Sequence, residues 1–123
     1  MAKKILIIED EELLSNLLKN KLSELGYEVS VASDGLQGFE AIKEVVPDLI
    51  LLDLVMPKMN GFEVMRKMQE DDSISSIPII IVSNSGQPVE IDKAKELGAK
   101  DWLIKTEFDP QEVIDKVNKQ LEE

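Results

Sequence analysis

The sequence of 123 residues contains neither cysteine nor histidine. Without cysteine there are no disulfides and no thiolate metal ligands, which favours a reducing compartment. The absence of histidine removes the commonest general base, and it excludes a Ser–His–Asp triad and every histidine-ligated metal site. The chemistry open to the chain therefore rests on carboxylates, hydroxyls and lysines, and a site built from hard oxygen ligands fits this set.

Basic residues, aromatic residues and long apolar runs are scarce as well. There are 14 lysines and arginines against 25 acids, a net charge of −11, whereas a nucleic-acid-binding domain presents a basic face. Aromatic residues make up only 4% of the chain, so we expect an aliphatic core. No apolar run approaches the roughly 18 residues that cross a bilayer. We therefore expect no direct nucleic-acid binding, no secretory signal, no membrane partner and a cytoplasmic location.

Short apolar runs alternate with amphipathic stretches along the whole chain. Apolar runs predict strands at 5–8, 49–52 and 77–82, and two further short stretches, 27–32 and 101–104, are strand candidates, which makes five strands. Between them, apolar residues recur every three or four positions, which is typical of helices; the first helix has leucines at 13, 14, 17, 18, 22 and 25. Gly26 and Gly98 are expected to end helices, and Pro88 and Asp109-Pro110 to begin them.

This alternation predicts the architecture. Strands that are apolar on both faces belong in a parallel sheet covered by helices on both sides. Right-handed crossovers then leave chiefly the doubly wound, flavodoxin-like α/β sheet of order 2-1-3-4-5, with five helices. The length fits one domain.

Polar residues follow the predicted strands where each strand ends. Glu9 and Asp10 follow the first strand, Asp53 the third, Ser83 the fourth and Lys105 the fifth. The carboxyl ends of parallel strands share one edge, where doubly wound folds place their ligands. We therefore expect these side chains to converge, although Asp10 also lies where it could cap the first helix.

Three carboxylates at one edge would repel each other unless one were protonated or a cation lay between them. Oxygen ligands without histidine or cysteine favour Mg²⁺ before Mn²⁺ or Ca²⁺. A lysine and a hydroxyl at the same edge suit a phosphoryl group. The pattern thus predicts magnesium-dependent phosphoryl chemistry with an aspartate as the nucleophile.

The chain resembles the receiver domains of two-component response regulators over its whole length. Each matching stretch is short, but their order and spacing together are highly specific. The stretches are Ile5–Glu11, Pro47–Pro57 with Asn60-Gly61, Pro78–Ser83, and Gly98-Ala99 followed by Trp102–Lys105.

The resemblance implies that Asp53 accepts a phosphoryl group from the phosphohistidine of a sensor histidine kinase or a histidine phosphotransfer protein. Mg²⁺ would be bound by Asp53, directly by Asp10, through water by Glu9, and by the backbone carbonyl of Val55. Residues 1–123 would form a single receiver domain without an output domain. Such a domain is a signalling phosphoacceptor that catalyses only its own phosphorylation and dephosphorylation, and switches the binding of a downstream protein.

The resemblance also assigns the residues that sense phosphorylation. Lys105 would bind the phosphoryl oxygens, the Ser83 hydroxyl would move to hold them, and Trp102 would be the coupled aromatic switch. The chain departs from the family pattern at three places. Asn84 replaces the usual small residue and is expected to narrow the entry to the site. Trp102 replaces tyrosine or phenylalanine, and Thr106 replaces the proline of a cis peptide.

The threonine predicts a trans bond between Lys105 and Thr106. A cis bond costs roughly 2.5–4 kcal/mol before a residue other than proline, against about 0.5–1 kcal/mol before proline.

Three other functions compete with this interpretation. A magnesium-dependent aspartyl-phosphate phosphohydrolase typically has a second aspartate two residues after the nucleophile, and Val55 stands there. A flavin-binding module needs a phosphate-cradling loop after the first strand, where Glu9–Glu12 would repel phosphate. A degenerate receiver that only binds proteins would not retain the full set of Asp10, Asp53, Ser83 and Lys105.

Overall fold

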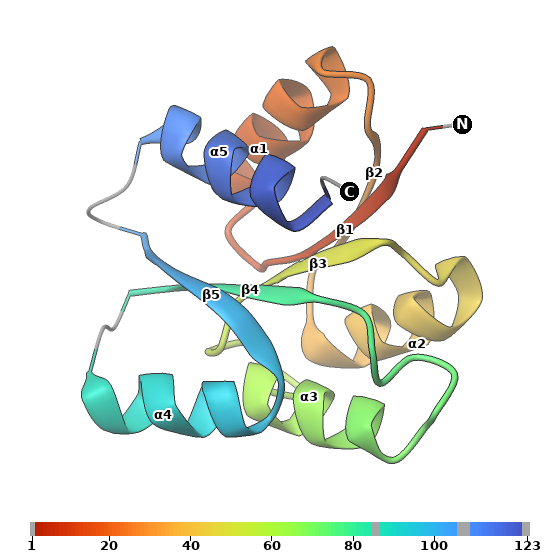
Figure 1. Ribbon diagram of the computed structural model, residues 1–123, viewed down its shortest axis with the longest axis vertical. Coiled ribbons are helices and arrows are strands. Elements are labelled where there is room, and N and C mark those ends of the chain that lie inside the picture. The colour runs from red at the N-terminus through yellow and green to blue at the C-terminus, as the bar shows by residue number, and fades with distance from the viewer. Residues whose placement is uncertain (1, 85–86, 106–108, 122–123) are drawn as a thin grey trace.

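A five-stranded parallel sheet runs through the middle of the molecule (Figure 1). The structure is a computed structural model that describes residues 2–84, 87–105 and 109–121. The strand order is β2-β1-β3-β4-β5, which confirms the predicted doubly wound topology. The strands are β1 (Lys4–Ile8), β2 (Glu28–Ala32), β3 (Leu49–Leu52), β4 (Ile79–Ser83) and β5 (Ala99–Ile104).

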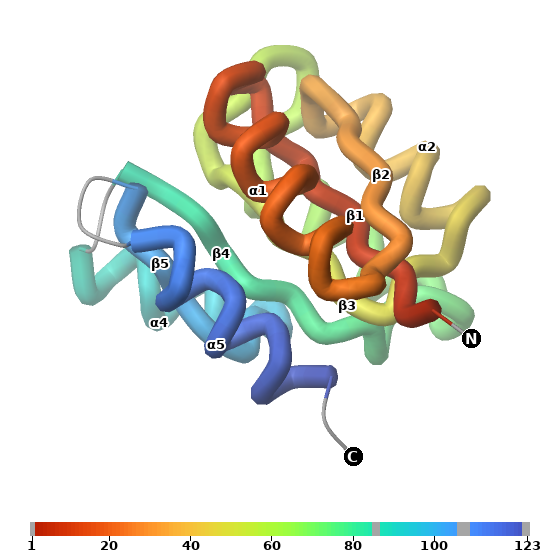
Figure 2. Tube along the Cα trace, turned by 90° about the horizontal axis from the view of Figure 1, so that it is seen from above, coloured from red at the N-terminus to blue at the C-terminus, as the bar shows by residue number. Residues whose placement is uncertain are grey.

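Helices cover both faces of this sheet (Figures 1 and 2). α1 and α5 lie on one face, and α2, α3 and α4 lie on the other. Among the described residues, no helix has the length and apolarity that a membrane span requires. The helices are α1 (Glu12–Glu24), α2 (Gly35–Val45), α3 (Gly61–Gln69), α4 (Pro88–Glu96) and α5 (Pro110–Leu121).

The core is aliphatic, as the scarcity of aromatic residues predicts. Two buried clusters lie on opposite faces of the sheet, and the described hydrophobic residues buried in them are all aliphatic or methionine. β3 is central, so all four of its residues are buried. Four methionines fill the space around α3, as expected of a flexible apolar side chain; they are Met56, Met59, Met65 and Met68.

Local signals place most helix ends correctly. Gly26 and Gly98 have φ values of +93° and +108°, which glycine adopts without strain, just after α1 and α4. Pro88 is the first residue of α4. At α5, the Asp109 side chain accepts a hydrogen bond from the backbone N–H of Glu112 at 2.8 Å, as an N-cap does.

The leucines of α1 extend beyond the face that the helix buries. Leu18 and Leu22 are buried, but Leu13 is 88% exposed and Leu17 is 41% exposed. Ser15 is buried instead, and its hydroxyl donates to the carbonyl of Glu12. The periodicity identifies the helix, but a helix packed on a sheet buries only a stripe of its surface. Leu13 and Leu17 therefore face outward, whereas Leu14 packs against the margin of the core.

Val46, the C-cap residue that follows α2, has a strained backbone. Its φ of 49° and ψ of 68° are left-handed, and its side chain is 51% exposed. A β-branched residue is a conformational outlier there, at a cost of about 1–3 kcal/mol. Because asparagine tolerates this conformation, we expect Val46→Asn to raise the melting temperature by a few degrees in a thermal melt. Val89→Asn, at an exposed position within α4, serves as the control and gives no such gain. An equal gain from both variants would contradict the strain argument.

Candidate functional site

The candidate site lies where the strands end at their carboxyl edge. Glu9, Asp53 and Lys105 each follow directly on a strand, and backbone hydrogen bonds extend the sheet by one residue to hold them. The N–H of Asp53 donates to the carbonyl of Ile8 at 2.9 Å, and the N–H of Lys105 donates to that of Ser83 at 2.7 Å. Residues far apart in sequence are therefore fixed side by side.

Three carboxylates gather at this edge, as the positions of the strand ends predict. Glu9, Asp10 and Asp53 each offer a carboxylate oxygen, and these oxygens lie within 4.8 Å of one another. Glu9 is 3% exposed and Asp53 is 4% exposed, while Asp10 faces solvent. A set of hard oxygen donors at this spacing, partly buried and partly open, fits a divalent cation such as Mg²⁺.

The Lys105 ammonium lies among these carboxylates. Its Nζ is 2.9 Å from Glu9 and 3.2 Å from Asp53 Oδ2, and its side chain is only 7% exposed. A third carboxylate, that of Glu11, lies 2.9 Å from the same nitrogen. Sequence reasoning missed Glu11 as a site residue. Glu11 belongs to the run of acids that follows β1, but which of these acids reaches Lys105 depends on the residue at which α1 begins.

Burial and charge shift the protonation of the site. Burial raises the pKa of Glu9 to about 7, although hydrogen bonds from Lys105 and from the backbone N–H of Glu11 oppose the rise. Burial also raises the pKa of Asp53, against the attraction of Lys105. Burial would lower the pKa of Lys105, but its contacts with Glu9, Glu11 and Asp53 together raise it. One ammonium thus fails to neutralise the acids around it, which leaves negative charge for a further cation.

A hollow of about 180 Å³ opens over the acids. Val55 lies at its rim with an exposed side chain, and its backbone N–H donates to Asp53 Oδ1 at 3.4 Å. Asn84 is exposed and also lines the hollow, and the narrowing of its entry by this side chain stays a prediction. Ser83 is buried at the end of β4. The metal contact of the Val55 carbonyl and the role of the Ser83 hydroxyl stay predictions.

Trp102 lies away from the acids, on β5. It is paired in register with Ile81 of β4 and is half-buried at the margin of the core. It lines a separate hollow of about 270 Å³ together with Ile91 and Lys95 of α4. Trp102, a residue of β5, therefore borders the hollow that α4 also lines. Its role as a switch stays a prediction. The Lys105–Thr106 peptide lies outside the described residues.

Asp10 is not the helix cap that its position suggested. α1 begins at Glu12, and its N-cap residue is Glu11, whose side chain makes no capping hydrogen bond. The chain continues for one more residue before it turns into the helix. The Asp10 carboxylate is consequently left among the acids of the site.

Two glycines hold the loop that follows Asp53. A Cβ on Gly61 would lie 2.5 Å from the carbonyl oxygen of Asp53, and one on Gly35 would lie 1.7 Å from that of Met59. Neither position has room for a side chain. The loop from β3 to α3 is thus packed closely against the starts of α2 and α3, which fixes the backbone beside Asp53.

Comparison with known proteins gives a consistent result. The model of the response regulator receiver domain matches residues 5–118. The chain is 34% identical to the chemotaxis protein CheY of Thermotoga maritima, over 97% of this chain and 98% of that protein. The solved structure of chemotaxis protein CheY4 of Vibrio cholerae superimposes with a TM-score of 0.91 at 26% identity, covering 98% of this chain and all of the other.

Other relatives are longer than this chain. It is 35% identical to the DNA-binding response regulator MtrA of Mycobacterium tuberculosis, over 98% of this chain but 51% of that protein. The chain therefore spans about half the length of such DNA-binding relatives.

Proposed function

Because the chain belongs to the family of response regulator receiver domains, we propose that Asp53 is its phosphoacceptor and that a histidine kinase or a histidine phosphotransfer protein is the donor. Membership makes the chain a signalling phosphoacceptor. The observation that carries the choice of Asp53 is its buried carboxylate, 3.2 Å from the Lys105 ammonium and beside Glu9 and Asp10. Incubation with Mg²⁺ and acetyl phosphate, followed by intact-mass measurement, should show the addition of one phosphoryl group.

In the proposed reaction a carboxylate oxygen of Asp53 attacks the phosphorus of the phosphohistidine. The phosphorus–nitrogen bond breaks, its electron pair stays on the imidazole, and an acyl phosphate forms on Asp53. Lys105 supplies positive charge beside the oxygens of the transferring group, in a place where burial strengthens that attraction. Asn84 and Val55 line the hollow through which the donor must reach Asp53.

Glu9, Asp10, Asp53 and the backbone carbonyl of Val55 would hold the Mg²⁺ ion, with Glu9 acting through water. When bound, the ion supplies positive charge that the phosphoryl oxygens need during transfer. The excess of carboxylates over ammonium groups at the site supports this assignment.

Phosphorylation would then change the surface that a partner recognises. We propose that the Ser83 hydroxyl moves to the phosphoryl group and that Trp102, between β5 and α4, changes its packing as a result. The longer relative MtrA is a DNA-binding response regulator, as its name says. The net charge of −11 favours a protein, not DNA, as the direct downstream partner of this domain. We propose that the two meet in the cytoplasm.

We further propose that the domain dephosphorylates itself slowly. Hydrolysis needs a water molecule aligned with the phosphorus, and the side chain of Val55, exposed at the rim of the hollow, has no group to orient it.

Val55→Asn should therefore shorten the lifetime of the phosphoryl group several-fold, because its amide can hydrogen-bond the attacking water. The measurement is intact mass against time after the donor has been removed. Val55→Leu, which is also apolar, is the control and should keep the lifetime of the original protein. An unchanged or longer lifetime in Val55→Asn would contradict this account.

A further inference from the structure

Three carboxylates hold the Lys105 ammonium. Glu9, Glu11 and Asp53 accept hydrogen bonds from its Nζ at 2.9, 2.9 and 3.2 Å. An ammonium group has three N–H donors, so these contacts occupy all of them. Any new acceptor must displace one of the three carboxylates.

The carboxylate of Glu11 is the one that leaves most easily. Glu9 and Asp53 are buried, and Glu9 also accepts a hydrogen bond from the backbone N–H of Glu11 at 2.9 Å. The Glu11 side chain is 56% exposed. Water can replace Lys105 at Glu11 with little loss of solvation, whereas a buried carboxylate left without a partner is costly.

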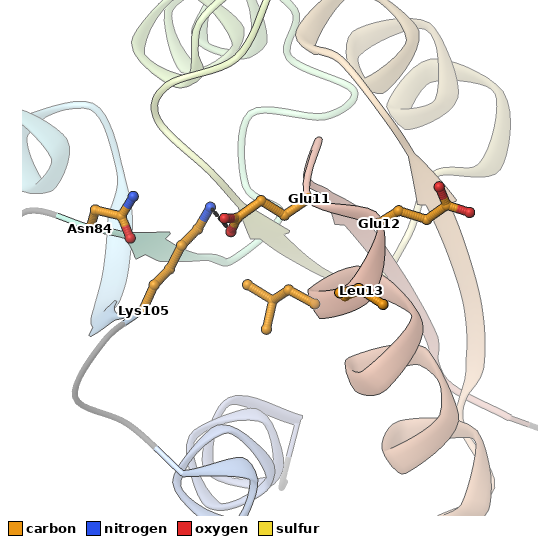
Figure 3. A pocket seen from close by; sticks show the side chains of 6 residues that line it. Glu11, Glu12, Leu13, Asn84 and Lys105 are labelled. Carbon is orange, nitrogen blue, oxygen red and sulfur yellow. Dashed lines mark hydrogen bonds and ion pairs between the residues drawn. The ribbon is translucent and has the colours of Figure 1, made fainter.

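The Glu11–Lys105 pair also separates two hollows. Both residues line the acidic hollow over Asp53 and an outer hollow of about 500 Å³ that Leu13 and Leu14 help to form. Figure 3 shows the pair between Asn84 and Leu13, with the Glu12 carboxylate pointing the other way. Release of Glu11 would therefore free one donor of Lys105 and break the ion pair that lies between the two hollows.

We propose that Glu11 is a positioning residue that competes with the incoming phosphoryl group for Lys105. This inference rests on the proposed function of Asp53. In the unphosphorylated protein Glu11 holds the third donor of Lys105, and phosphorylation proceeds when Glu11 gives that donor up. The exposed Glu11 contact thus slows phosphorylation while leaving the buried contacts of the site intact.

The test compares Glu11→Gln with Glu12→Gln. Both variants remove one negative charge at the start of α1, but only Glu11 contacts Lys105. With acetyl phosphate and saturating MgCl₂, intact mass against time should show phosphorylation about two- to fivefold faster in Glu11→Gln, the range expected for a partly exposed ion pair. Glu12→Gln should react at the rate of the original protein. Equal rates in all three proteins would overturn the proposal.

A double-mutant cycle separates competition from simple repulsion of the anionic donor. If Glu11 acts through Lys105, the gain from Glu11→Gln disappears in a Lys105→Ala background. If Glu11 only repels the donor, the gain persists and the proposal is wrong. Where Lys105→Ala reacts too slowly to measure, Glu11→Asp decides. It keeps the charge but shortens the side chain, so competition predicts acceleration and repulsion predicts none.

Failure of this inference differs from failure of the proposed function. If the original protein takes up no phosphoryl group under these conditions, the role of Asp53 is refuted. If it is phosphorylated and Glu11→Gln is no faster, only the role of Glu11 is refuted.

Discussion

Asp53→Asn is expected to take up no phosphoryl group from acetyl phosphate in the presence of Mg²⁺. The amide has nearly the volume of the carboxylate, so the buried position stays filled, but it lacks the nucleophilic oxygen anion. Intact-mass measurement after incubation with the donor should show one added phosphoryl group on the original protein and none on the variant.

A second aspartate provides the matched control. Asp72 is exposed between α3 and β4 and is not one of the clustered acids, and Asp72→Asn should be phosphorylated at the original rate. Uptake by Asp53→Asn at the original rate, on any other residue, would refute the assignment of Asp53.

The same substitution, which abolishes phosphorylation, is expected to keep or raise the melting temperature. Burial raises the pKa of Asp53, so the folded protein disfavours its charge. An amide removes that charge from beside Glu9 and Asp10. Without metal, we therefore expect Asp53→Asn to melt at the same temperature as the original protein or above it.

The convergence of the site could be predicted because it follows from topology. Residues 9, 53 and 105 are distant in sequence, but a parallel sheet of order 2-1-3-4-5 brings the carboxyl ends of β1, β3 and β5 to one edge. Continuous apolar runs identified β1, β3 and β4, and the first polar residue after each run marked its end. Neither step required knowledge of a side-chain conformation.

The contact of Glu11 could not be predicted in the same way. Four consecutive acids, Glu9–Glu12, follow β1, and their directions depend on the residue at which α1 begins. A shift of one residue in that start changes which acid reaches Lys105 and which points to solvent. Patterns of sequence place helix ends less precisely than this. The exposure of Leu13 depends on the same start.

Mg²⁺ is expected to raise the melting temperature of the protein. We expect the ion to bind where folding assembles Glu9, Asp10 and Asp53, and to bind the unfolded chain far less. At a concentration one hundred times the dissociation constant, the stabilisation is about 2.7 kcal/mol. For a domain of this size that corresponds to roughly 5–15 °C. Thermal melts over a series of MgCl₂ concentrations measure the shift.

Substitutions of Asp10 and of Glu9 should reduce this magnesium-induced rise in melting temperature by different amounts. Asp10→Ala should remove most of it, because Asp10 is expected to contact the ion directly. Glu9→Gln should weaken it less, because its contact is expected through water. Asp72→Ala is the control and should keep the full shift. Equal stabilisation of the original protein and Asp10→Ala would rule out the metal site as proposed.

The shift should also grow with pH, and the direction follows from Glu9. Its pKa is about 7 in the folded protein against an ordinary value of 4.5. Between these values the folded protein keeps a proton that the unfolded chain has released, so without metal the contribution of Glu9 to stability is full below about 4.5 and is lost as the pH rises through 7. Above that pH, Glu9 is charged and repels Asp53 and Asp10, and a divalent cation relieves the repulsion. We therefore expect Mg²⁺ to stabilise the protein more above pH 7 than below it. Since Glu9→Gln removes the group that titrates, its magnesium shift should vary less with pH than that of the original protein. An equal pH dependence in the two proteins would show that another group governs the effect.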